Sequence, residues 1–170
     1  HDYYVDGPPI VSDAFMDYGD ESGSRWGSVL LGSLGNGGAG IFALDVSEPE
    51  NFSASDVLWD LDATNLPELG SLPGRASIVK LPDDSWAAVF ANGYDSANHK
   101  AGLYIVSLED GSLVKFIDTE ADGTSDAPNG LSAALPIDSD GDNKIDRVYA
   151  GDLLGNMWVF DLSSDVSSNW

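Results

Sequence analysis

The feature that most constrains the fold of this chain is an internal repeat. Three segments share one pattern: an apolar stretch, a turn that contains glycine, and a second apolar stretch that begins near an aromatic residue. They are Trp26 to Val46, Ser85 to Leu108 and Asp146 to Leu162. When Val29, Val89 and Val148 are aligned, the units recur about every sixty residues, a period typical of chains built from copies of one structural unit.

Each repeat predicts a group of short β-strands. The apolar stretches are rich in β-branched and aromatic residues and are bounded by turn signals, and no long segment has helical periodicity. Further strands are expected beside the repeats, at 57–61, 75–81, 113–117 and 129–137. Up to four antiparallel strands per unit predict an all-β protein made of quinoprotein-like β-propeller blades. A β-sandwich is the alternative, because it too has many short strands.

About three blade units fit into residues 1–170, which we expect to form a single β-propeller fragment. A closed propeller has about four to eight blades, so the fragment is predicted to be an incomplete section of a larger ring. No stretch at the start of the chain has the pattern of a targeting segment, and we expect any such segment to lie outside it.

The charge of the chain limits its partners. Twenty-nine Asp and Glu against seven Lys and Arg give a formal net charge of −22. Such a surface repels phosphate backbones and anionic lipids, so neither nucleic acid nor a membrane surface is an expected partner, whereas cations are. No apolar run approaches the ~20 residues of a membrane-spanning helix. The absence of cysteine removes disulfides, thiol catalysis and Cys-based zinc sites.

The run DSDGDNKID, residues 138–146, predicts a calcium-binding loop. Alternate positions of a tightly curled loop can point oxygens at one centre, and Ca²⁺ takes six to eight oxygens at about 2.3–2.6 Å. Mg²⁺ fits less well because it demands near-ideal octahedral geometry, and zinc and copper lack nearby Cys or His ligands. The predicted ligands are the carboxylates of Asp138, Asp140, Asp142 and Asp146 and the backbone carbonyl of Lys144.

The residues between these ligands support the curl. Gly141 and Asn143 tolerate positive φ angles, the Lys144 ammonium should lie outside, and Ile145 should fix the loop to the core. The loop is not an EF-hand, because position 6 is Asn143 instead of Gly and position 12 is Tyr149 instead of Glu. We therefore expect an Asp loop inserted between β-strands.

Other acidic positions give weaker signals. The spacing of Asp118, Asp122 and Asp126 is regular, but their polar surroundings predict a surface loop, and the same holds for Asp13 and Asp17 near the start. Three further aspartates lie at the ends of predicted strands and are expected to close turns: Asp45, Asp152 and Asp161. Asp45 and Asp161 occupy matching places in the repeat.

Catalysis finds little support in the sequence. There is no G-x-S-x-G, P-loop or H-E-x-x-H pattern, and His99 lies in a polar loop where we expect it to be exposed. Four tryptophans fall in or beside predicted strands and are expected to pack in blades, not to form a sugar platform: Trp26, Trp59, Trp86 and Trp158.

These residues together resemble a known family. The sequence is similar to the C-terminal β-propeller of the PilC/PilY-type type IV pilus biogenesis proteins, the pilus-tip adhesins. The similarity covers nearly the whole chain in order and is most specific in its last stretch. The matching segments are HDYYVDGPPIVSDAF at 1–15, SVLLGSLGNGGAGIFALDVSEP at 28–49, GRASIVKL at 74–81, WAAVFANGYDS at 86–96 and NGLSAALPIDSDGDNKIDRVYAGDLLGNMWVFDLSS at 129–164.

The resemblance implies a non-enzymatic, calcium-binding adhesion and pilus biogenesis module on the bacterial cell surface, at the pilus tip and associated with the outer membrane. Calcium in the 138–146 loop would regulate pilus extension and retraction, and so twitching motility and surface attachment. The implied partners are pilus components, among them minor pilins, and a surface or host receptor. The chain has no Arg-Gly-Asp tripeptide, so no integrin contact is carried over.

Two other propeller classes are alternatives. A quinone-dependent dehydrogenase has blades of similar outline, but this chain has no cysteine pair and no evident cofactor cluster. An integrin-like propeller carries an Asp loop in each blade, whereas only one of the three units here has one.

Overall fold

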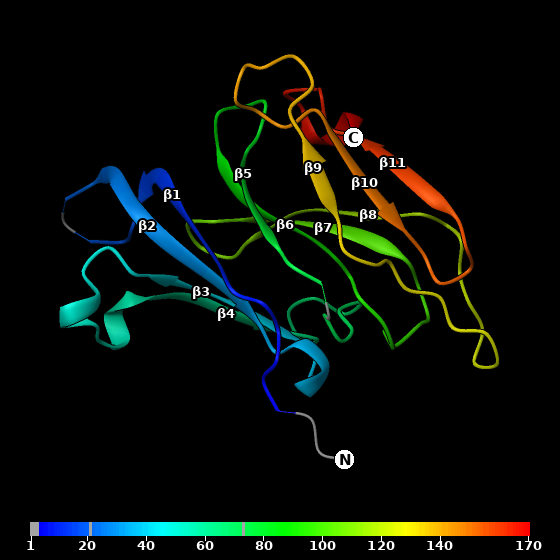
Figure 1. The fold of residues 1–170 in the computed structure, drawn as a ribbon. Helices are drawn as coiled ribbons and strands as arrows, with labels where there is room; N and C mark the ends of the chain where they lie inside the picture. Colours follow the sequence, from blue (N-terminus) through cyan, green and yellow to red (C-terminus); the bar gives the residue numbers. More distant parts are fainter. Residues whose placement is uncertain (1–3, 21, 73) are drawn as a thin grey trace.

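A computed structural model describes residues 4–20, 22–72 and 74–170 of the chain. These ranges form three antiparallel sheets whose strands follow one another in sequence order, as the ribbon in Figure 1 shows. The first sheet contains β1 (Ile10–Asp17), β2 (Ser24–Ser33), β3 (Gly40–Asp45) and β4 (Val57–Asp62). The second contains β5 (Ser77–Lys80), β6 (Trp86–Ala91), β7 (Gly102–Ser107) and β8 (Leu113–Asp118), and the third β9 (Leu135–Ile137), β10 (Arg147–Gly151) and β11 (Met157–Asp161).

Helical structure in the described ranges is limited to single 3₁₀ turns, at Gly35–Gly37, Pro49–Asn51, Ala54–Asp56 and Ser167–Asn169. None of these is long and apolar enough to cross a membrane. The all-β, propeller-type fold is confirmed, and the three sheets do not close into a ring. Of the segment 1–15 used for the family resemblance, the first three residues lie outside the described ranges.

The predicted strands are found with small shifts, apart from two differences. Strand β1 was not predicted, although Ala14 and Met16 alternate with exposed neighbours in the pattern of a half-buried strand. Strand β9 is three residues long, where the sequence predicts one over 129–137. Pro136 lies within it and has no N–H to donate, and upstream only the single bridge of Leu131 to Asp152 continues the pairing.

Strand pairing also corrects the repeat register by one residue. In each sheet the second strand pairs with the third, and the residues aligned in the third strands are Leu44, Val106 and Phe160. Their partners in the second strands are Leu30, Ala88 and Val148, respectively. The alignment of Val29, Val89 and Val148 is therefore one residue early in the first unit and one late in the second. A shift of one residue changes the face that a strand side chain occupies.

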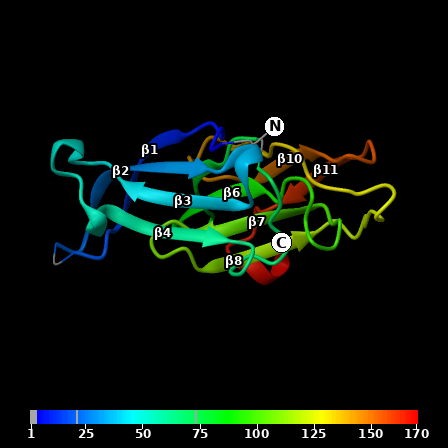
Figure 2. The ribbon, with the colours of Figure 1, turned by 90° about the horizontal axis from the view of Figure 1, so that it is seen from below.

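The middle sheet is the centre of the core because neighbours cover both of its faces. Ala88, Phe90 and Tyr104 pack toward the first sheet, while Val89 and Ile105 from the same two strands pack toward the third. This alternation follows from the two-residue period of a strand, and explains why β6 and β7 are almost continuously apolar. Figure 2 shows the strands of the first sheet in the order β1 to β4 and, beside them, β6, β7 and β8 of the second sheet in the same direction.

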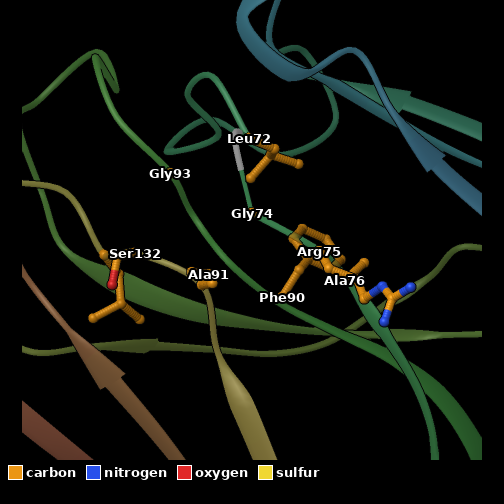
Figure 3. A pocket seen from close by; sticks show the side chains of 10 residues that line it. Leu72, Gly74, Arg75, Ala76, Phe90, Ala91, Gly93 and Ser132 are labelled. Carbon is orange, nitrogen blue, oxygen red and sulfur yellow. The ribbon is translucent and has the colours of Figure 1, made fainter. Parts of the chain in front are cut away.

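A small cavity lies where the loops before β5 and β9 meet β6. Its volume is about 10 Å³, enough for about one water molecule. Figure 3 shows Leu72, Phe90 and Ser132 around it, and a methyl group at Gly74 would lie 2.8 Å from the side chain of Ala133. The close approach of these backbones makes this a packing junction and not a ligand pocket.

Candidate metal centre

The predicted calcium loop is the connection between β9 and β10. It leaves the sheet after Ile137 and returns at Arg147, where the Asp146 N–H donates to the Ile137 carbonyl at 2.9 Å. Gly141 and Asn143 have φ angles of 84° and 68°, so both supply the left-handed backbone that the sequence predicted for them. The loop is thus a curled insertion in a β-hairpin.

Backbone donors hold the first aspartate of the loop. The N–H of Gly141 donates to Asp138 Oδ1 at 2.7 Å, and the N–H of Asn143 donates to Asp138 Oδ2 at 2.8 Å. Both groups lie across the curl from Asp138, so these bonds close the loop around its carboxylate. This arrangement fixes the position of one predicted ligand before any ion binds.

Asp146 is held from the other end of the loop. Its Oδ2 accepts hydrogen bonds from the Ser139 hydroxyl at 2.5 Å and the Ser139 N–H at 2.7 Å. These two bonds lower the pKa of the Asp146 carboxyl below its usual value, and the nearby charge of Arg147 adds to the effect. Sequence reasoning missed Ser139, whose signal is only that a hydroxyl stands next to the first aspartate.

Three of the four predicted carboxylates converge. One oxygen from each of Asp138, Asp140 and Asp146 lies within 4.8 Å of the other two. Two oxygens bound to one calcium ion at about 2.3–2.6 Å can lie at most about 5 Å apart, so this spacing fits a shared cation. Asp142 is not part of the group, and its Oδ1 accepts the Lys144 N–H at 2.8 Å.

The converging carboxylates have no basic partner within the part of the chain that the structure describes. No lysine or arginine there forms an ion pair with an aspartate of the 138–146 loop. A hollow of about 310 Å³ borders the loop between Pro82 and Asp165. Several carboxylates held close together repel one another, and a cation with water ligands in this space would remove the repulsion.

Lys144 and Ile145 connect the loop to the rest of the fold, as the sequence predicted. The Lys144 ammonium finds its partners outside the loop: it donates to the Pro82 carbonyl at 2.9 Å and lies 3.1 Å from Asp84 Oδ2. Ile145 is buried in the core between the second and third sheets, and its N–H donates to the Lys80 carbonyl at 3.0 Å. The loop is therefore anchored to the turn between β5 and β6.

The other acidic positions have structural partners. Lys100 forms an ion pair with Asp118 and lies 3.5 Å from Asp122 Oδ1, while Asp126 is exposed. The surface loop predicted around Asp13 and Asp17 is wrong, because both residues lie in strand β1. Asp13 accepts from the Ser28 hydroxyl and Asp17 from the Gly19 N–H. The structure groups none of these carboxylates as it does those of the 138–146 loop.

The strand-end aspartates close turns, as expected. Asp45 accepts from the N–H and hydroxyl of Ser47, and Asp161 accepts in the same way from Ser163. Their matching role confirms that the repeat extends to the turn that follows the third strand.

Asp152 lies in the turn between β10 and β11 and accepts from Asn129, Asn156 and Trp158. Burial alone would raise the pKa of Asp152, but these hydrogen bonds outweigh it and lower the pKa to about 2.

One minor prediction was wrong. His99 is half-buried instead of exposed, with a φ angle of 55°, and its Nδ1 has no hydrogen-bond partner among the described residues.

The comparison with known proteins decides the family. Residues 1–169 match the model of the PilY1 beta-propeller domain. The chain belongs to this family. It is 44% identical over 177 residues to a "Type IV pilus biogenesis factor PilY1 homolog" of Xylella fastidiosa, covering all of this chain and 12% of that protein. It is 43% identical to the "Type IV pilus biogenesis factor PilY1" of Pseudomonas aeruginosa strain PAO1, covering 95% of this chain and 13% of that protein.

A solved structure shows the same fold. The crystal structure of the Pseudomonas aeruginosa PilY1 C-terminal domain superposes with a TM-score of 0.81 at 42% sequence identity. The match covers 94% of this chain and 30% of that one. The chain thus spans 12–13% of the two relatives above and under a third of the solved domain.

Proposed function

We infer that this chain is a calcium-binding module of a type IV pilus biogenesis factor. The single observation that carries the metal site is the convergence of Asp138, Asp140 and Asp146 without a basic partner in the described ranges. Asp142 and the carbonyl of Lys144 complete the proposed ligand set, because a calcium ion needs more oxygens than three carboxylates supply.

The donor set favours calcium over other metals. All the proposed ligands are oxygens on a short, exposed loop, and no cysteine exists in the chain. Calcium tolerates such irregular, flexible geometry, whereas magnesium requires an octahedron and zinc prefers nitrogen and sulfur. The proposed role in pilus biogenesis rests on the relatives of this chain, which are named type IV pilus biogenesis factors.

The proposed role is regulatory and not enzymatic. Calcium would fix the loop and, through Lys144 and Ile145, its position on the second sheet. A ligand shifts a conformational equilibrium only by binding one state more tightly than the other, and the ordered loop would be the favoured state. In the intact protein this shift would act on pilus extension and retraction, twitching motility and surface attachment, at the pilus tip on the outer cell surface, through minor pilins and a surface or host receptor.

The family match favours this function over the two alternative propeller classes. A quinone-dependent dehydrogenase would need a cofactor site, and an integrin-like propeller would need an Asp loop in each blade. The convergent acids in the described ranges lie in a single loop of the third sheet.

Thermal unfolding with and without calcium tests the metal site. Calcium should raise the melting temperature of the chain, because binding to the folded state alone stabilises it. Asp146→Ala should abolish the rise, and Asp118→Ala, which removes an acid paired with Lys100, should leave it intact. A melting temperature that does not change across a calcium titration would reject the proposal. For the cellular role, the same Asp146→Ala change in the full-length protein should alter twitching motility.

A further inference from the structure

A group of exposed aromatic side chains lies apart from the proposed metal ligands. Trp26 is 65% exposed and Phe15 is 48% exposed, and the two residues are directly paired across β1 and β2. The expectation that the tryptophans pack inside blades holds for Trp59, which is 6% exposed, but not for Trp26. Large aromatic side chains left in water are costly unless something covers them, so these two residues need an explanation.

The aromatic rings meet at steep angles and do not stack face to face. Phe15 and Trp26 have ring centroids 5.7 Å apart at an interplanar angle of 59°, and Trp26 meets Trp86 at 6.1 Å and 76°. Trp86 packs against the core between the first and second sheets, which fixes one side of the group. Neither contact is a face-to-face stack, and Trp26, which is 65% exposed, keeps apolar ring surface in contact with solvent where a flat partner could lie.

These aromatics line a hollow that all three sheets contribute to. Its volume is about 810 Å³, within the range of small-molecule sites, and its other lining residues are Lys80, Asp84 and Asn143. Phe15 and Trp26 come from β1 and β2, Lys80 and Asp84 from the end of β5 and the turn that follows it, and Asn143 from the 138–146 loop. Figure 1 shows the β5–β6 turn and the 138–146 loop close together at one end of the second and third sheets. The hollow therefore combines an apolar platform with a polar rim.

The charges on the rim are already paired. Asp84 Oδ1 lies 2.6 Å from the Lys80 ammonium, and Asp84 Oδ2 lies 3.1 Å from the Lys144 ammonium. A cationic ligand would meet these two lysines, and an anionic ligand would meet the field of a chain with a net charge of −22. A neutral ligand faces neither cost. Its hydroxyl groups can still exchange hydrogen bonds with the carboxylate, the ammonium and the Asn143 amide.

We propose that this hollow binds a neutral glycan through a pyranose ring. The apolar face of the sugar lies on Trp26 and Phe15, and its hydroxyl groups bond to Asp84, Lys80 and Asn143. A pyranose has one face of C–H groups and a rim of hydroxyls, so it matches an aromatic platform with a polar rim. The site shares Asn143 with the 138–146 loop but uses none of the proposed metal ligands.

A glycan array and a titration test this site. The probes are immobilised neutral glycans that end in glucose, galactose, mannose or N-acetylglucosamine, followed by calorimetric titration with the free form of any that binds. Trp26→Ala should weaken binding about tenfold or more, and Phe15→Ala by a smaller factor, because each removes part of the platform. Met157→Ala is the matched control, since Met157 is a 73% exposed apolar residue of the third sheet.

The variants are expected to fold because both aromatic side chains are largely in water, and their melting temperatures verify this. Binding by a neutral glycan that is lost in Trp26→Ala and kept in Met157→Ala supports the proposal. Three results would overturn it: no neutral glycan binds, binding survives in Trp26→Ala, or free choline competes for the site better than any sugar. Because Asn143 lies in the 138–146 loop, the titrations are run both with calcium and with a chelator. The loss in Trp26→Ala is expected in both conditions, so the two proposals can fail separately.

Discussion

Two acidic loops of this chain have similar sequences and different structures. Residues 118–126 contain Asp118, Asp122 and Asp126 as well as Glu120, and residues 138–146 contain four aspartates. In the first loop, Lys100 pairs with Asp118 and lies near Asp122. In the second, three carboxylates face one another and the nearest lysine, Lys144, turns to the β5–β6 turn.

The comparison teaches that the number of acids does not define a cation site. In the first loop, Lys100 from the connection between β6 and β7 already supplies a positive charge. A metal ion would therefore add little. The second loop has backbone N–H groups that hold Asp138 in place, and within the described ranges no lysine or arginine forms an ion pair with its carboxylates. Carboxylates fixed close together before binding pay less to reorganise around an ion.

The largest expected effect separates the two loops directly. Asp138→Asn should lower calcium affinity about 100-fold, or about 2.8 kcal/mol, because it removes a charged ligand from the centre of the group. The matched change Asp122→Asn in the first loop should leave the affinity unchanged. Isothermal titration calorimetry measures both, and equal losses in the two variants would erase the distinction between the loops.

Asp152 is a third kind of acidic site: its carboxylate accepts hydrogen bonds from neutral N–H groups and, among the described residues, has neither a lysine partner nor other carboxylates facing it. Asp152→Asn should lower the free energy of unfolding at pH 7 by about 1–2 kcal/mol, after allowing for solvent screening, because an amide nitrogen cannot accept from Trp158 or Asn129. The folded-state pKa is lowered to about 2, so this stability is present above the ordinary value of 3.8 and is lost as the pH falls toward 2.

Urea unfolding at pH 7 and at pH 2.5 measures the Asp152 effect. The difference between the wild type and Asp152→Asn should shrink at the lower pH, whereas the exposed control Asp126→Asn should show no difference at either. A gap that stays constant with pH would contradict the lowered pKa.

Removing the Lys100 ammonium tests whether it stabilises the acidic loop 118–126. Lys100→Met should lower the free energy of unfolding only slightly, because the ion pair with Asp118 is partly exposed and screened by solvent. The loss should decrease when salt is added, since salt screens the repulsion left between the acids. Lys115→Met is the control, because Lys115 donates to the neutral carbonyl of Ser167 and its effect should not depend on salt. A salt-independent loss in Lys100→Met would count against the pairing.

The smallest effect concerns the aspartate outside the convergent group. Asp142→Asn should weaken calcium binding only about fivefold, or about 1 kcal/mol, because the Asp142 carboxylate lies outside the convergent group and must move to reach the ion. Calorimetric titration of Asp142→Asn and Asp138→Asn with calcium gives the ratio of their dissociation constants. An Asp142→Asn loss as large as that of Asp138→Asn would make all four carboxylates equivalent.

The sequence predicted the sheets well because their signals are local. Alternating or continuous apolar runs between turns define most of the strands, and the repeat fixes their grouping. Strand β1 was missed although it alternates in the same way, and β9 was predicted too long because a stretch around Pro136 reads as apolar without being able to pair fully. Register was wrong by one residue where loops of different length separate the strands.

The metal loop was predictable in its curl and its anchors, since positive φ at Gly141 and Asn143 and burial of Ile145 follow from residue type. The pairing of Lys144 with Asp84 was not, because it depends on how the second and third sheets lie together. The same holds for the hollow beside Trp26, whose lining residues come from all three sheets. Contacts between distant segments leave no local pattern in the sequence.

A crystal structure of the chain grown with calcium tests the central claim most directly. The account predicts an anomalous peak between Asp138, Asp140 and Asp146, with their oxygens and the Lys144 carbonyl at about 2.3–2.6 Å from the ion. The loop 118–126 should show no peak, because Lys100 already pairs with its acids. Absence of density in the 138–146 loop at saturating calcium, or a peak at Asp118 and Asp122 in its place, would contradict the account.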